Sequence, residues 1–230
     1  MKKVLITGAA GFIGSHLTEY FSKKNFRLTV FDRYNSFGSF GWLDTIKKDK
    51  NIKFKLGDIR DFDSVNNVIK GQDIVIHLAA LIGIPYSYVA PLSYVRTNVQ
   101  GTVNVLESVR KNDIELMINT STSETYGTAI YRPIDEKHPL QGQSPYSASK
   151  IAADKLSESY FNSFETPVIT IRPFNTFGPR QSSRAVIPTI ISQLLTNQDL
   201  KLGELKATRD FTFVGDTVKG YIKVILATLI

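Results

Sequence analysis

Near the N-terminus the sequence reads Val4-Leu5-Ile6-Thr7-Gly8-Ala9-Ala10-Gly11-Phe12-Ile13-Gly14. An apolar run is followed by three glycines spaced by three residues and by a helical pattern that extends to about Lys24. The first glycine permits a sharp turn, the second lets a phosphate approach the backbone, and the third lets the helix pack closely on the strand. The start of that helix offers N–H groups and a partial positive charge to an anion. The spacing therefore predicts a strand–turn–helix unit that binds a dinucleotide.

The rest of the chain alternates between short apolar runs and helical patterns. Strands are predicted at 28–31, 52–56, 73–78, 114–119 and 168–171. Long helices are predicted at 92–111 and 145–164. Near-continuous apolar strands separated by helices indicate a parallel sheet with both faces covered, and right-handed crossovers make it doubly wound. We therefore predict an α/β fold of the Rossmann type for residues 1–172, with ligands at the carboxyl ends of the strands.

After Arg172 the pattern changes, because prolines and glycines interrupt the chain repeatedly. A helix is predicted at 184–195, short strands at 200–202 and 211–213, and an apolar helix end at 225–230. We expect residues 173–230 to form a small, incomplete lobe that binds substrate, and we expect the chain to be truncated at its C-terminus.

The composition excludes several classes of protein. The 230 residues are 42% hydrophobic, which is enough for a real core, and they include no cysteine, so disulfides, iron–sulfur clusters and thiol nucleophiles are ruled out. The three histidines are far apart, and we expect no metal site. The net charge is +7, but the basic residues are scattered without interleaved aromatics, so we expect no nucleic-acid partner. No apolar stretch is long enough to cross a bilayer, and we expect a cytoplasmic protein.

Acidic residues at the ends of the second and third predicted strands are candidate cofactor ligands. The Asp32 carboxylate can accept hydrogen bonds from both ribose hydroxyls of an adenosine and would repel a 2′-phosphate, which favours NAD. Arg33 beside it could tolerate NADP. Asp58 could reach the adenine amino group while Ile59 packs on the ring, or Asp58 could instead cap the helix that begins near Phe62.

Tyr146 and Lys150 form the reactive pair that we predict. Residues four apart share one face of a helix, and Tyr146-Ser147-Ala148-Ser149-Lys150 begins a predicted helix. A phenol with a pKa near 10 is a poor base at neutral pH, but a neighbouring ammonium and an oxidised nicotinamide would both favour the phenolate. The fifth predicted strand ends in hydroxyl groups, where Thr122 could bind a substrate hydroxyl and Glu124 could remove an acidified proton.

Taken together, these motifs resemble those of the extended short-chain dehydrogenase/reductases that act on nucleotide sugars. The resemblance runs from residue 1 to about residue 225. The matching segments are Thr7-Gly8-x-x-Gly11-x-x-Gly14, Asp32, Gly57-Asp58, His77-Leu78-Ala79-Ala80, Tyr146-x-x-x-Lys150 and Arg172-Pro173-Phe174-Asn175-Thr176-Phe177-Gly178-Pro179-Arg180. The resemblance implies that NAD contacts the glycine turn, the strand ends and the reactive pair, namely Gly8, Gly11, Phe12, Ile13, Gly14, Asp32, Arg33, Asp58, Ile59, Leu78, Ala79, Ala80, Tyr146 and Lys150.

The resemblance also implies roles for single residues. Tyr146 and Lys150 would assist hydride transfer from sugar C4 to NAD, and Thr122 would hydrogen-bond O4. Asn175 and Arg209 match positions that contact the substrate diphosphate, and we place Arg180 with them as a substrate-binding residue.

Two further implications concern the scaffold. Asn98 matches a position that supports the backbone of the site. The two long predicted helices would pair across a homodimer, and members of the family continue well beyond residue 230.

The triplet Thr122-Ser123-Glu124 indicates the subfamily. The 4,6-dehydratases carry Thr-Asp-Glu, so the base is retained here, whereas Ser123 replaces the acid that protonates the departing 6-hydroxyl. The surrounding strings 120–129 and 184–189 look most like dehydratases of nucleotide-linked N-acetylglucosamine in surface-polysaccharide pathways. We expect C4 oxidation, elimination of water across C5–C6 and return of hydride to C6, which gives a 4-keto-6-deoxy sugar. The alternatives are a 4-epimerase, a decarboxylase of nucleotide-linked uronic acids, and an NAD-binding chain with little activity.

Overall fold

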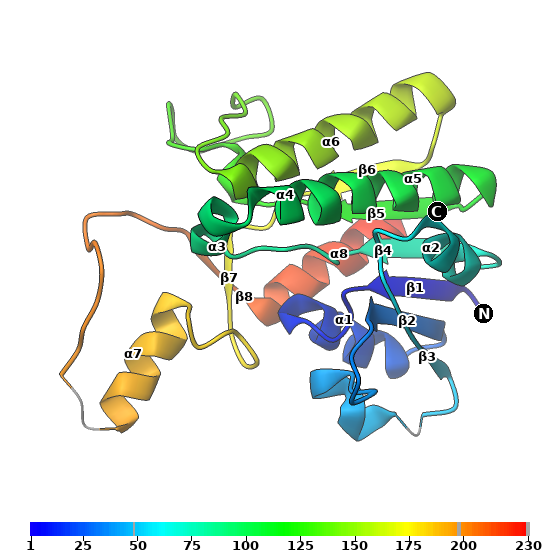
Figure 1. Cartoon of the computed structure of the whole chain (residues 1–230), viewed down its shortest axis with the longest axis horizontal. Coiled ribbons are helices and arrows are strands. Elements are labelled where there is room, and N and C mark those ends of the chain that lie inside the picture. The colour runs from blue at the N-terminus through cyan, green and yellow to red at the C-terminus, as the bar shows by residue number, and fades with distance from the viewer. Residues whose placement is uncertain (48, 197–198, 229–230) are drawn as a thin grey trace.

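The computed structural model describes residues 1–47, 49–196 and 199–228. Its centre is a sheet of six parallel strands in the order β3-β2-β1-β4-β5-β6 (Figure 1). The strands are β1 (Lys3–Thr7), β2 (Arg27–Arg33), β3 (Ile52–Gly57), β4 (Ile74–His77), β5 (Leu116–Thr120) and β6 (Val168–Ile171). The strand order runs outward from β1 in both directions, so the predicted doubly wound parallel sheet is confirmed.

Helices connect the strands, and several of them cover the two faces of the sheet. They are α1 (Phe12–Ser22), α2 (Phe62–Ile69), α3 (Ile84–Val89), α4 (Pro91–Tyr94), α5 (Gly101–Lys111), α6 (Pro145–Phe164), α7 (Val186–Leu195) and α8 (Val214–Thr228). Short helical turns lie at η1 (Gly41–Ile46), η2 (Val95–Gln100) and η3 (Ser123–Thr125). The predicted helix 92–111 is therefore interrupted, because η2 is a π-helical turn that joins α4 to α5.

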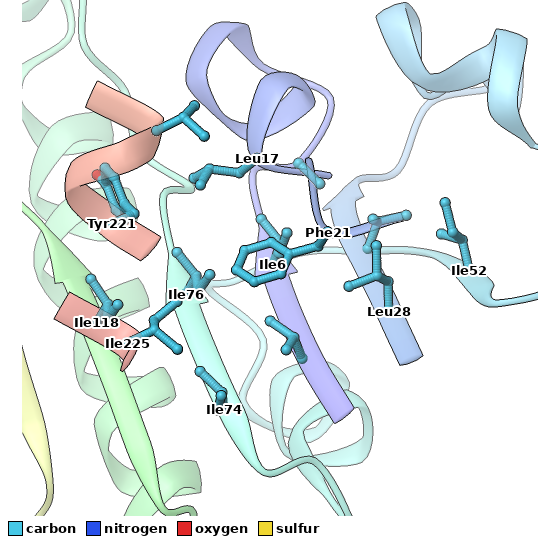
Figure 2. Close-up of a cluster of buried hydrophobic side chains, with 14 of the residues drawn as sticks. Ile6, Leu17, Phe21, Leu28, Ile52, Ile74, Ile76, Ile118, Tyr221 and Ile225 are labelled. Carbon is cyan, nitrogen blue, oxygen red and sulfur yellow. The ribbon is translucent and has the colours of Figure 1, made fainter. Parts of the chain in front are cut away.

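Alternate residues of each buried strand pack on opposite faces of the sheet. Figure 2 shows one face, where Ile6 and Ile76 belong to one buried cluster with Leu17 and Phe21 of α1. On the other face, neighbouring strand residues such as Leu5 pack against α2 and α5. Because both faces are covered, the buried centres of β1, β4 and β5 are apolar on both faces, which explains the continuous apolar runs in the sequence.

The C-terminal part differs from the prediction in two places. The predicted strand at 200–202 is wrong, because these residues are irregular and pair with none of the strands in the described ranges. The predicted strand at 211–213 is present as β8 (Phe211–Phe213), and it pairs in parallel with β7 (Asn175–Phe177), which the sequence pattern did not indicate.

The two C-terminal helices occupy different environments. No residue of α7 is buried, and the helix stands away from the sheet (Figure 1). By contrast, Tyr221 and Ile225 of α8 belong to the core cluster on the α1 face of the sheet (Figure 2). The division at residue 172 stays a prediction, although α8 itself packs on the sheet. The predicted helix end is described as far as Thr228, and residues 229–230 lie outside the described residues. Within the described ranges, no helix is both long and apolar enough for a membrane span.

Candidate active site

The glycine turn after β1 is built by close backbone approaches. Gly8 has φ +69°, and a Cβ on it would lie 2.7 Å from the backbone nitrogen of Ala79 at the end of β4. A Cβ on Gly14 would overlap the carbonyl oxygen of Gly8 and lie 2.8 Å from the Cα of Ala9. A side chain at Gly8 would therefore collide with the chain after β4, and one at Gly14 would push α1 away from the turn, so both positions require glycine.

Asp32 lies at the end of β2 and faces this turn. One carboxylate oxygen accepts a hydrogen bond from the backbone N–H of Ala10 at 2.8 Å, and the other accepts one from the N–H of Arg33 at 2.8 Å. These two contacts fix the carboxylate beside the turn. Each carboxylate oxygen has a second lone pair, which leaves Asp32 able to accept hydrogen bonds from a ligand.

Asp58 follows β3 and pairs with a nearby arginine. The Nε of Arg60 donates to Oδ1 of Asp58 at 2.9 Å, and the arginine holds the pKa of this carboxyl below its usual value. The alternative that Asp58 caps the next helix is wrong, because Asp61 is the N-cap of α2 and accepts from the N–H groups of Asp63 and Ser64. Asp58, paired with Arg60, lines the cleft beside Ile59.

These elements surround a cleft of about 960 Å³. It lies where the carboxyl ends of the central strands meet. Nearly all of the predicted cofactor residues line it, including Gly8, Gly11, Phe12, Ile13, Gly14, Asp32, Arg33, Asp58, Ile59, Leu78, Ala79, Ala80 and Tyr146. Lys150 lies behind this wall. The cleft opens at the place where doubly wound sheets bind ligands.

Tyr146 is held in place at the first turn of α6. Ser144 caps this helix through a reciprocal pair of hydrogen bonds with Ser147, and Pro145 takes the first helical position. The ring of Tyr146 meets that of Tyr94 edge-on, with centroids 6.2 Å apart. Only 6% of Tyr146 is exposed, so its position and orientation in the cleft wall are well defined.

Lys150 is buried one turn later on α6, with only 3% of its surface exposed. Its Nζ donates to the carbonyl oxygen of Thr120 at 2.7 Å. Burial lowers the pKa of Lys150 to about 8, against the opposing effect of the Asp154 carboxylate. The ammonium is therefore near its titration point at physiological pH, which is unusual for a lysine.

The pKa of Tyr146 differs from the sequence-based expectation. We expected a neighbouring ammonium to favour the phenolate, but burial raises the pKa of Tyr146 to about 12. A hydrogen bond with Thr122 lowers the pKa, whereas the charges of Glu124 and Asp154 raise it further. The protein's own groups thus keep this phenol protonated at neutral pH.

The loop after β5 carries the predicted acid–base residues. Thr122, Ser123 and Glu124 all line the cleft, and Thr122 caps the short turn η3 by accepting from the N–H of Glu124 at 3.2 Å. Glu124 is close enough to Tyr146 for its charge to raise the phenol pKa. The structure thus brings Thr122, Glu124 and Tyr146 together, and their catalytic roles remain predictions.

The three predicted substrate residues lie in different surroundings. Asn175 lines the cleft at the start of β7, and Arg180 lines it while donating to Glu19 of α1 at 2.6 Å. Arg209 lies outside the cleft lining, and its guanidinium contacts the carbonyl oxygen of the adjacent Thr208. Roles in binding substrate stay predictions for all three.

Asn98 and Tyr221 make contacts that support the site, and the sequence predicted only the first of these residues. The side chain of Asn98, in the π-turn, accepts a hydrogen bond from the backbone N–H of Leu81 and donates one to the carbonyl oxygen of Leu81. The Nδ2 of Asn98 also donates to the hydroxyl of Ser149 at 2.9 Å. Tyr221 of α8 donates to the hydroxyl of Thr120 at 2.9 Å, next to the carbonyl that binds Lys150. No motif surrounds Tyr221, so only its helical spacing of apolar neighbours marks it, and that spacing indicates a core residue.

With this geometry established, comparison with known proteins identifies the family. Residues 5–228 match a family model described as GDP-mannose 4,6 dehydratase. The chain belongs to the nucleotide-sugar epimerase/dehydratase family. The match covers nearly the whole chain, in agreement with the motifs quoted from its sequence.

Curated members of this family are longer than the chain. A dTDP-D-glucose 4,6-dehydratase of Dictyostelium discoideum is 35% identical over 96% of this chain and 55% of its own length. The corresponding enzyme of Homo sapiens is 34% identical over 97% of this chain and 65% of its own length. The chain thus spans less than two thirds of these relatives.

Solved members of the family share the fold. A dTDP-glucose 4,6-dehydratase from Streptomyces venezuelae, solved with NAD, is 29% identical with a TM-score of 0.88, covering 96% of this chain and 71% of that one. A UDP-glucuronic acid 4-epimerase from Bacillus cereus, in complex with UDP-glucuronic acid and NAD, is 29% identical with a TM-score of 0.90, covering 97% and 73%. The family thus includes both reaction types on the same fold.

Proposed function

We propose that the chain carries the catalytic machinery of an NAD-dependent nucleotide-sugar 4,6-dehydratase. The proposed reaction oxidises C4 of the sugar, eliminates water across C5 and C6, and returns hydride to C6. Its product is a nucleotide-linked 4-keto-6-deoxy sugar. The 4,6-dehydratases among the relatives support this reaction.

The cleft has the features that NAD requires. Gly8 and Gly14 allow the close approaches of the turn, and Asp32 presents a fixed carboxylate beside it. A cleft of about 960 Å³ has room for a dinucleotide together with part of a sugar. When bound, NAD supplies a reversible hydride acceptor. We therefore propose NAD as the cofactor, in line with the relatives solved with it.

Tyr146 is the proposed acceptor of the C4 hydroxyl proton, and Thr122 is positioned to hydrogen-bond the same oxygen. Burial holds the pKa of Tyr146 at about 12, so the phenol needs a positive charge beside it before it can act as a base near neutral pH. A buried Lys150 ammonium one helical turn away, together with a cationic ligand in the cleft, would provide it. C4 stays a ketone in the product, so the proton taken by Tyr146 would balance the proton that C5 gains when hydride returns to C6.

The position of Glu124 carries the proposal of a dehydratase. Its carboxylate lines the same end of the cleft as Tyr146 and acts on that phenol through its charge. Oxidation at C4 acidifies the neighbouring C5–H, and a carboxylate placed there can remove that proton. Once protonated, Glu124 can return the proton to the departing 6-hydroxyl, so that one water leaves. The Ser123 hydroxyl, also at the cleft, can hydrogen-bond the leaving oxygen.

A Glu124→Gln substitution tests this assignment. The amide keeps the shape of the side chain but cannot accept a proton, so we expect water elimination to fall by at least about a hundredfold. NAD binding should be unchanged, because Glu124 is not among the expected NAD contacts and the amide keeps its size. Incubation with a panel of nucleotide sugars, read by mass spectrometry for loss of water, measures the effect. Ser123→Ala is the matched neighbour and should slow the reaction less.

Deuterium uptake separates the steps. In deuterated water the native chain should incorporate deuterium at C5 of the product, because C6 receives the hydride taken from C4, and Glu124→Gln should not. Undiminished dehydration by Glu124→Gln would remove this residue from the mechanism.

A 4-epimerase is the second candidate, and Ser123 favours it. A serine stands at the position where the 4,6-dehydratases carry an aspartic acid, and 4-epimerases are among the structural relatives. An epimerase would return hydride to C4 with inverted configuration. A product of unchanged mass with the opposite C4 stereochemistry would therefore favour this candidate.

Three finer points belong to the same proposal. We propose nucleotide-linked N-acetylglucosamine as the substrate class, on the resemblance of residues 120–129 and 184–189. We also propose a homodimer that pairs through the helices within 92–111 and 145–164, and a cytoplasmic location. The substrate panel and a measurement of molecular mass in solution test the first two.

A further inference from the structure

A buried ion pair lies behind the reactive side chains and has no part in the chemistry described above. Asp154 follows Lys150 by one turn of α6, and its side chain is 2% exposed. Its Oδ2 accepts a hydrogen bond from the Nε of Arg172 at 2.9 Å. Its Oδ1 is also buried and has no hydrogen-bond partner among the residues that the structure describes. Burying a carboxylate with only one of its two oxygens hydrogen-bonded costs free energy, so we look for a functional reason for Asp154 at this position.

Arg172 also reaches the loop that carries Glu124. Its Nη1 donates to the hydroxyl of Tyr126 at 3.2 Å, and its guanidinium lies 5.3 Å from the centre of the Tyr126 ring. Tyr126 is 96% buried, stacks on Phe174 and follows Glu124 by two residues. Arg172 therefore connects three separate elements: helix α6, the loop after β5, and the segment after β6.

The charge of Asp154 acts on Lys150. Residues 150 and 154 share one face of α6, and the carboxylate opposes the effect of burial by raising the pKa of Lys150. The other titratable groups around this lysine are Tyr146 on the same helix, His77 on β4 and Tyr221 on α8. Burial keeps all three neutral near pH 7, so none of them supplies a counter-charge.

We propose that Asp154 and Arg172 are positioning residues, which keep Lys150 in its ammonium form and hold the Glu124 loop against the helix of Tyr146. Asp154 provides the negative charge that the ammonium needs. Arg172 offsets the cost of burying that carboxylate and, through Tyr126, fixes the loop. This inference rests on the proposed function, but both of its halves can be measured without an enzymatic assay.

The charge half is tested by titration of Lys150 in the whole chain. NMR of 13C- and 15N-labelled lysine, with Lys150→Met to assign the signal, follows the ammonium directly. Asp154→Asn removes the charge and keeps the shape, so the midpoint for Lys150 should fall by about one pH unit. Glu158→Gln is the matched control, because it removes an exposed carboxylate from the same helix and should leave the midpoint unchanged. An unchanged midpoint in Asp154→Asn would overturn this half of the proposal.

The loop half is tested by Tyr126→Phe, which removes one hydroxyl and leaves every charge in place. Hydrogen–deuterium exchange of the amides at 123–127 should accelerate by about tenfold, while exchange in β1 stays the same. Arg172→Lys should produce a similar change, because a lysine cannot contact Asp154 and Tyr126 together. Unaltered exchange in both variants would refute the coupling, and Tyr126→Phe serves even if Asp154→Asn does not fold.

Catalysis provides a readout that a purely structural role would not move. In Asp154→Asn the alkaline limb of the kcat profile should shift to lower pH, because Lys150 loses its proton earlier, while KM changes little. If the chain dehydrates nucleotide sugars but neither the Lys150 midpoint nor the loop exchange changes in the variants, this inference is refuted and the proposed function stands. The expected shifts in a chain without dehydratase activity would leave the positioning intact and refute the proposed function instead.

Discussion

Protonation of His77 should destabilise the folded chain steeply as the pH falls. This residue is buried at the end of β4 between two threonines. The hydroxyl of Thr102 donates to the carbonyl oxygen of Asn98 at 2.6 Å, so it can only accept from His77, whose Nε2 lies 3.2 Å away. Nε2 therefore carries the proton, and Nδ1 accepts from the hydroxyl of Thr7 at 2.8 Å.

The size of the effect follows from the pKa. Burial, with a smaller contribution from the charge of Lys150, lowers the pKa of His77 from 6.5 to about 3. The folded chain thus binds fewer protons than the unfolded chain between these two values, so the stability contribution is complete above pH 6.5 and is lost toward pH 3. Each unit of separation is worth about 1.4 kcal/mol, which gives about 5 kcal/mol in total and about 2 kcal/mol between pH 7 and pH 5.

Urea unfolding of the native chain and of His77→Gln at pH 7 and pH 5 measures this contribution. At pH 7 the substitution should cost about 1–3 kcal/mol through its altered hydrogen bonds. Between pH 7 and pH 5 the native chain should lose about 2 kcal/mol more than the variant. All other titratable groups are common to both proteins, so they cancel in this comparison. Equal losses would refute the reasoning, as would an NMR spectrum of His77 showing the proton on Nδ1.

Two further substitutions test the scaffold of the site. Gly14→Ala should destabilise the fold by several kcal/mol and weaken dinucleotide binding, because the added Cβ would overlap the carbonyl oxygen of Gly8. Thermal unfolding and NAD titration measure the two effects. A variant with native stability and native affinity for NAD would contradict the packing argument. Asp61→Ala should lower the free energy of unfolding by about 1 kcal/mol, because it removes the side chain that accepts hydrogen bonds from the N–H groups of Asp63 and Ser64 at the start of α2. Chemical unfolding at pH 7 measures this loss. Activity should be retained, because Asp61 lies outside the cleft lining.

Much of the cofactor half of the site could be predicted from the sequence. The glycine turn, Asp32 and the strand ends are encoded in short motifs, and a parallel sheet brings the ends of its strands to one edge. The expected cofactor residues other than Lys150 therefore line the cleft, and their contacts with NAD stay predictions. The assignment of Asp58 remained ambiguous because Asp58 and Asp61 both precede α2, and only the observed backbone shows that Asp61 makes the cap.

The environment of the reactive pair could not be predicted in the same way. Spacing placed Tyr146 and Lys150 on one helix face, but their pKa values depend on how completely the surrounding elements exclude water. The Tyr-x-x-x-Lys spacing predicts a lowered pKa for Tyr146, whereas burial raises that pKa. The partner of Lys150 comes from β5 and the partner of Asp154 from the segment after β6, and both segments are distant from α6 in the chain.

The sequence by itself determined the doubly wound sheet, the dinucleotide turn and most of the strand-end residues that face the cleft, because these depend on local periodicity and on motifs a few residues long. Only the tertiary structure decided that α8 covers the sheet, that residues 200–202 form no strand, and that Arg172 joins Asp154 to Tyr126. These features depend on which segments, distant in the sequence, lie next to each other in the fold. A local sequence pattern does not specify those neighbours.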